Sequence, residues 1–210
     1  MFDKKIAVFA LIGASLSCSF AASADDDEAG ELAALKFALA PRGDYGFTLT
    51  QSCVRTPFQP VPAAGFDPVT HRLLVDGELI NTVGSGVMHF AKDGAVTVDS
   101  TTVTEISASQ LLAGALPVST PTQFTCAGNF TLQGDRRLAV SLACDVPSGR
   151  PGVKVTVQPL DFAGFIGVGA RAIDMSSNSG GLHTVTVAVG GTPVQQRERI
   201  CLQSMKLDKL

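Results

Sequence analysis

The feature that most constrains the fold is a long succession of short alternating apolar and polar runs, separated by turn residues. In the first run, Tyr45, Phe47 and Leu49 alternate with small or polar residues, which is the period-two pattern of a half-buried β-strand. The Lys-Asp-Gly segment at 92–94 is a typical hairpin turn. About eight or nine such runs follow one another with almost no helical pattern, so residues 45–210 are expected to form a single all-β domain.

The simplest arrangement for such a series of strands is a single antiparallel up-and-down (lipocalin-like) β-barrel of about eight strands. A two-sheet β-sandwich is the alternative. The chain contains no tryptophan, so it lacks the buried tryptophan that marks immunoglobulin-type sandwiches. The barrel is therefore the arrangement that we favour.

The first 24 residues are typical of a secretory signal peptide. Two lysines precede an apolar run at 6–16, and Ala-Ser-Ala at 22–24 supplies the small-x-small pattern that signal peptidases accept. We therefore expect an exported protein, periplasmic or secreted, with lipid attachment at Cys18 as the alternative. Residues 25–44 form an N-terminal acidic segment in which Leu32, Leu35 and Leu39 fall on one helical face, so a short helix is expected there.

Four cysteines follow the signal segment, and in an oxidising compartment they favour two disulfides with three possible connectivities. Residues 133–136 have the character of a hairpin turn, and the centre of this turn lies midway between Cys126 and Cys144. Residues opposed across a hairpin have Cβ atoms about 4.5–5.5 Å apart, so a Cys126–Cys144 bond is expected. By elimination, Cys53 in the first strand pairs with Cys201 in the last, and these strands touch when a sheet closes into a barrel.

Both ends of the β-region carry recognisable patterns: residues 43–53 read G-x-Y-x-F-T-L-x-x-S-C, and residues 199–201 are Arg-Ile-Cys. In these two patterns the chain resembles a group of small exported bacterial all-β proteins of unknown function, whose first strand and C-terminal run have the same form. The resemblance implies export, an all-β shape and a bond between the first and the last cysteine. It implies no activity, and Cys126 and Cys144 go beyond the pattern.

Charge and hydropathy exclude two classes of partner. The net charge of −3 gives the chain no attraction for phosphate backbones, so no nucleic acid is expected to bind. No segment after the signal approaches the ~20 apolar residues of a spanning helix. Membrane barrels carry girdles of interfacial aromatic residues, whereas this chain has no Trp and one Tyr. We therefore do not expect an integral membrane protein.

The sequence contains none of the common motifs of metal sites, thiol-redox sites or catalytic nucleophiles. His71, His89 and His183 stand at none of the spacings typical of metal ligands, and they are interpreted as surface side chains. There is no Cys-x-x-Cys and no Gly-x-Ser-x-Gly nucleophile elbow. The sequence therefore predicts no catalytic residue, no metal site and no cofactor.

The two cysteines of the second predicted pair lie on strand faces of different character. Cys53 shares its face with apolar residues, whereas Cys201 shares its face with Arg197, Arg199 and Gln203. Bonded cysteines on neighbouring strands point to the same side. The interpretation that we favour is a β-bulge that switches the facing of one strand and leaves Arg197 and Arg199 in solvent. The alternative is a barrel interior that holds arginine, which would suit an anionic amphiphile such as a fatty acid.

The function favoured at this level is non-catalytic binding of a small apolar or amphiphilic ligand, because barrels of about eight strands are wide enough to hold one. It predicts a lumen lined by Phe47, Leu49, Phe90, Phe124, Phe165 and Arg199. One alternative is a structural or interaction protein, an inhibitor or an envelope-associated partner, that acts through the long loops 55–70 and 107–122. The other is a small-barrel enzyme of the cyclase or isomerase type, which no residue pattern favours.

Overall fold

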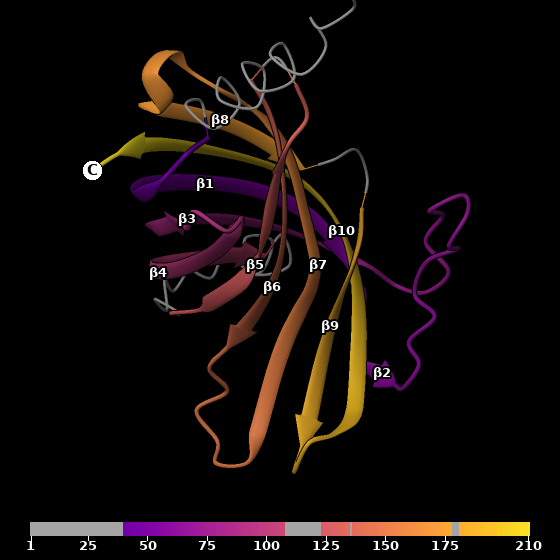
Figure 1. Cartoon of the computed structure of the whole chain (residues 1–210). Coiled ribbons are helices and arrows are strands. Elements are labelled where there is room, and N and C mark those ends of the chain that lie inside the picture. The colour runs from indigo at the N-terminus through magenta and orange to yellow at the C-terminus, as the bar shows by residue number, and fades with distance from the viewer. Residues whose placement is uncertain (1–39, 108–122, 135, 178–180) are drawn as a thin grey trace, which may run out of the picture. The chain divides into compact units, whose positions relative to one another are not determined.

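The computed structural model describes residues 40–107, 123–134, 136–177 and 181–210, with the side chains of 101–107 left out (Figure 1). The expected signal peptide, including Cys18, lies outside the described residues. So do residues 25–39, which hold the expected helix, and residues 108–122 of the second long loop. All described residues belong to one compact unit, Lys36–Leu210.

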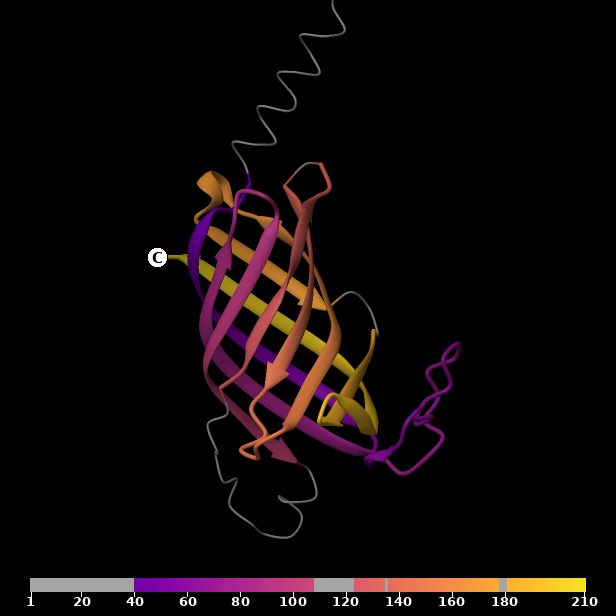
Figure 2. The same ribbon diagram turned by 60° about the horizontal axis from the view of Figure 1, so that its bottom comes forward.

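The described chain is a closed antiparallel β-barrel (Figures 1 and 2). Its elements are β1 Gly43–Arg55, β2 Gln59–Pro60, β3 Glu78–Phe90, β4 Ala95–Ser107, β5 Thr125–Leu132, β6 Arg137–Val146, β7 Val153–Ile166, the 3-10 helix η1 Val168–Ala170, β8 Ala172–Ser177, β9 Leu182–Val189 and β10 Thr192–Lys209. Each long strand pairs with the next along the chain, and β10 returns to β1.

The barrel wall has eight strand positions. β8 and β9 together fill one of these positions, because each of them pairs with β7 on one side and with β10 on the other. The short β2 pairs only with β10. The predicted antiparallel barrel is thus confirmed, and the alternative of a two-sheet sandwich is wrong.

The seam between β1 and β10 runs in continuous register from Tyr45 opposite Lys209 to Arg55 opposite Arg199. Within it, Cys53 stands opposite Cys201, and the two form a disulfide. The other predicted pair, Cys126 and Cys144, is also directly opposed, across β5 and β6, and forms the second disulfide. The two bonds fit an oxidising compartment.

One end of the barrel is filled by a packed aromatic cluster. The rings of Tyr45, Phe90 and Phe130 stack edge to face with centroids 5.3 Å apart. The buried Tyr45 hydroxyl donates a 2.6 Å hydrogen bond to the carbonyl of Ala170 in η1. Phe90, expected to line the lumen, is instead part of this packing and only 1% exposed. The aromatic cluster closes this end, and any interior space must lie beyond it.

Two irregularities in the strands shape the interior beyond the aromatic cluster. The β3–β4 register shifts at Gly86, where a Cβ would contact the Asp99 carbonyl and lie 2.9 Å from the Phe47 ring. Only glycine therefore leaves the Phe47 ring in its place. In β7, a register shift lets Val157 and Leu160 both face inward, with exposed residues between them.

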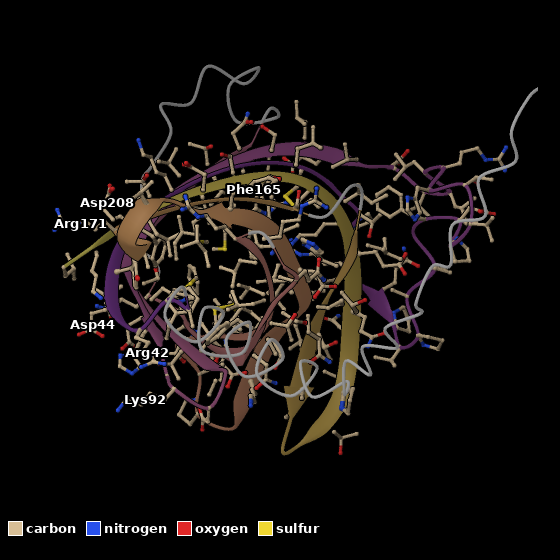
Figure 3. The ribbon with its side chains drawn as sticks, turned by 45° about the horizontal axis from the view of Figure 1, so that its top comes forward. Arg42, Asp44, Lys92, Phe165, Arg171 and Asp208 are labelled. Carbon is tan, nitrogen blue, oxygen red and sulfur yellow. A yellow bond between two sulfur atoms is a disulfide. The ribbon has the colours of Figure 1, made fainter. Side chains whose placement is uncertain are left out.

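The outer wall carries the charges at the closed end. Figure 3 looks into the ring of strands, and the side chains of Arg42, Asp44, Lys92, Arg171 and Asp208 point away from the ring. The inward positions of the neighbouring strands are apolar and buried. This alternation is the expected one for a barrel whose wall separates solvent from a core.

Candidate ligand-binding cavity

A cavity of about 390 Å³ occupies the barrel interior beyond the aromatic cluster. Its walls are mostly apolar and come from opposite sides of the barrel. The apolar lining includes Phe47, Leu49, Val98, Phe124, Leu142, Val157, Leu160, Phe162, Val185 and Met205. Two further hollows, of about 540 and 400 Å³, are more open to solvent. The interior cavity is the most enclosed of the three.

A belt of buried polar side chains crosses one wall of this cavity. Gln203, Gln51 and Thr82 stand side by side on β10, β1 and β3, and each is at most 7% exposed. Gln51 Nε2 donates to the sulfur atoms of Cys53 and Cys201, at 2.6 and 3.2 Å. Gln203 Oε1 is buried and has no hydrogen-bond partner among the described residues. Burying such a group without a partner costs about 1–3 kcal/mol.

Arg197 and Arg199 also line the cavity, so the expectation that a bulge leaves them in solvent is wrong. Among the described pairings of β10 with β1 and β9, the register shifts only between Pro193 and Gln195, before both arginines. No extra residue is therefore inserted between Arg199 and Cys201, and both keep the same facing. The sequence-level alternative, an interior that holds arginine, is the correct one.

His183 lies on the same inward face, although the sequence suggested a surface position. It stands opposite Arg199 in the β9–β10 register and is 2% exposed. Burial, and then the charge of Arg199, lower the pKa of His183 to about 4, while Asp161 acts in the opposite direction. The imidazole is thus neutral at pH 7, and its Nδ1 has no hydrogen-bond partner within the described part of the chain.

The other two histidines are exposed, as expected. His71 lies in the loop that follows β2. His89 Nδ1 lies 2.6 Å from Asp44 Oδ1 on the outer wall, with half of each side chain accessible to solvent. In the described residues, no group of three potential metal ligands comes together.

The six residues expected to line the lumen divide into two groups. Four of them, Phe47, Leu49, Phe124 and Arg199, do line the cavity. Phe90 belongs to the closed end, and Phe165, labelled in Figure 3, is 61% exposed on the outer wall beneath the Arg137 guanidinium. Phe165 faces outward because Gly164, its neighbour, stands opposite the buried Leu138.

Sequence reasoning assigned no site role to the polar lining residues Gln51, Thr82 and Gln203, or to His183 beside them, and it considered Arg197 only in the alternative of an interior that holds arginine. A signal for two of them was present, because Gln51 and Gln203 lie two positions from Cys53 and Cys201. Residues two apart in a strand share a face. The inward disulfide therefore also places both glutamine side chains inside.

The long segment that joins β1 to β3 contains β2 and is tied to β10 near the arginines. Glu198 Oε2 accepts hydrogen bonds from the backbone N–H groups of Gly65 and Phe66, at 2.7 and 2.9 Å. The Thr56 backbone is bonded to the Glu198 backbone, and the Phe58 ring lies 4.5 Å from the Arg197 guanidinium carbon. This segment, residues 56–77, is called loop 56–77; it contains the predicted loop 55–70 except Arg55, which ends β1, and continues to β3.

In the part of the chain that the structure describes, no helix is long and apolar enough to cross a membrane. The chain was also compared with models of protein families, with curated proteins and with solved structures, and none of the three comparisons found a match.

Proposed function

We propose that this protein is an exported, non-catalytic binding protein that holds a small apolar or amphiphilic ligand inside its barrel. The observation that carries the proposal is the interior cavity of about 390 Å³ with mostly apolar walls. Small-molecule sites are typically concave, lined by apolar and aromatic side chains with a few polar groups, and about 300–1,000 Å³ in volume. The cavity has each of these properties.

The first test is native mass spectrometry on protein exported by its own leader and purified without detergent. A discrete additional mass that disappears on denaturation supports the proposal and gives the mass of the ligand. Export is tested in the same spectrum, because cleavage after Ala24 and two disulfides define the mass of the polypeptide. A bare polypeptide mass, together with no binding of added apolar probes, contradicts the proposal.

A variant that fills the cavity tests where the ligand lies. Val157 lines the cavity and is 5% exposed, so Val157→Phe places a larger side chain in the ligand space. We expect it to weaken binding of an apolar fluorescent probe by about tenfold or more. Val83→Phe is the matched control, because Val83 is 56% exposed. Equal binding by the two variants, with melting temperatures showing both folded, would place the probe elsewhere.

A second candidate, an interaction protein, is favoured by the exposed apolar residues of loop 56–77. Phe58, Val61, Val69 and Leu74 are all at least 39% exposed. Exposed apolar groups on a loop that is tied at its base are typical of contact surfaces. A partner that co-purifies with the wild type and is lost from a Phe58→Ser/Val69→Ser variant supports this candidate. Unchanged co-purification contradicts it.

A further inference from the structure

We propose that the ligand is an amphiphile whose carboxylate lies against Arg197 and Arg199, while its apolar part extends toward Phe47, Leu49 and Met205. This inference rests on the proposed function and adds the chemical class of the ligand and its direction in the barrel. It draws on the placement of charge, the order of lining residues along the strands and one buried amide.

The two arginines form the cationic part of the cavity wall. They are two residues apart on β10, so they share a face at a spacing of about 6.6–6.8 Å. Among the lining residues that the structure describes, they carry the only charges. Each guanidinium has five N–H donors in a planar fork that matches a carboxylate, so it has donors for more than one acceptor.

Polar and apolar lining residues are ordered along the barrel. On β10 the inward positions run from Arg197 and Arg199 through Gln203 to Met205. On β1 the same direction runs from Gln51, opposite Gln203, to Leu49, opposite Met205, and then to Phe47. A ligand that is complementary to both the polar and the apolar lining has its head group beside the arginines and its apolar part toward the closed end.

Gln203 gives an independent indication of a polar ligand. Its side chain is 6% exposed and lines the cavity, and its Oε1 has no hydrogen-bond partner among the described residues. Buried polar groups in proteins are nearly always hydrogen-bonded, so an unpartnered one requires an explanation. The amide is located between the arginines and the apolar lining. Its oxygen is an acceptor and a carboxylate has no proton to donate, so the amide meets a bound carboxylate through its Nε2 donors, and Oε1 accepts from a water or a hydroxyl group.

The state of His183 agrees with a positive potential at this wall. Burial is the main cause of the low pKa of the imidazole, Arg199 on β10 lowers this pKa further, and Asp161 on β7 is the opposing charge. A carboxylate bound beside Arg199 adds negative potential close to His183 and favours its protonated form. Binding of the proposed ligand therefore raises the pKa of His183, whereas binding of an uncharged analogue in the same cavity leaves it low.

The experiment compares three probes of equal chain length, namely decanoate, decan-1-ol and decylamine, by calorimetric titration of the full exported protein. Decanoate is expected to bind about tenfold or more tightly than decan-1-ol, since only the carboxylate forms charge-assisted, bidentate hydrogen bonds with arginine. Arg199→Gln and Arg197→Gln are expected to reduce this preference. Arg137→Gln, which removes the same charge from the outer wall beside Phe165, is expected to retain it.

The outcomes separate the two proposals. The proposed carboxylate head group is contradicted if decan-1-ol or decylamine binds as tightly as decanoate, or if both cavity variants keep the preference for decanoate. The proposal that the cavity binds a ligand is retained in either case. If no probe binds, the proposed function itself fails. Melting temperatures show whether each variant is folded, and NMR titration of His183 gives a second readout. Its pKa is expected to rise with decanoate and not with decan-1-ol.

Discussion

His183 is a buried base whose ionisation is set by its surroundings. Its pKa is lowered from 6.5 to about 4, mainly by burial. The unfolded chain therefore binds a proton between pH 6.5 and 4 that the folded chain does not, and stability falls as the pH is lowered through this range. A shift of this size corresponds to roughly 3 kcal/mol at pH 4 and below.

Urea unfolding of the wild type and of His183→Gln at pH 7 and pH 4 measures this contribution. The wild type is expected to lose roughly 3 kcal/mol more than the variant over this interval. His71→Gln removes an exposed histidine and serves as the control. Equal losses in the wild type and in His183→Gln would show that this side chain does not become protonated on unfolding.

At the scale of the element, β10 contributes side chains both to the cavity and to the contact with loop 56–77. Arg197 and Arg199 face the cavity, and Glu198 between them holds loop 56–77 on the outside. Glu198→Ala removes two charge-assisted hydrogen bonds to the loop and leaves the backbone bond to Thr56 in place. The loop should therefore open more often without unfolding of the barrel.

Limited trypsin digestion reports this opening, because Arg72 is an exposed cleavage site in the loop. Cleavage after Arg72 is expected to be about tenfold faster in Glu198→Ala than in the wild type, with a similar melting temperature. Asp174→Asn changes an exposed acid on β8 and is the control. A cleavage rate in Glu198→Ala no faster than in the control would contradict the anchoring role.

On the scale of the whole molecule, the two disulfides constrain very different lengths of chain. Cys53–Cys201 spans 148 residues and joins the first strand to the last, whereas Cys126–Cys144 spans 18 residues within one hairpin. Loop-closure entropy predicts stabilisation of about 5 kcal/mol for the long loop and about 3 kcal/mol for the short one. Loss of the seam disulfide should therefore be the more damaging.

Denaturant unfolding of two double variants, Cys53→Ala/Cys201→Ala and Cys126→Ala/Cys144→Ala, tests this order. All four cysteines are at most 5% exposed, so the packing lost is similar and the difference reflects loop length. The seam variant is expected to be less stable than the hairpin variant by about 2 kcal/mol. A smaller loss for the seam variant would contradict the entropic argument.

The parts of the site that could be predicted are those in strands whose apolar–polar alternation shows which side chains point inward. On β1, regular alternation was sufficient, and Phe47 and Leu49 line the cavity as expected. On β7, residues 162–166 are apolar on both faces, so alternation could not show that Phe165 faces outward. His183 was misplaced because its inward facing depends on the pairing of β9 with β10.

By itself, the sequence determined the all-β class, the hairpin turns and the pairing of Cys126 with Cys144. These features depend on local period and on residues close together in the chain. Only the tertiary structure decided that Arg197, Arg199 and His183 face the interior beside an apolar cavity. The physical reason is that their facing follows from the register of β10 against β1 and β9, and the β1 seam joins segments separated by most of the chain.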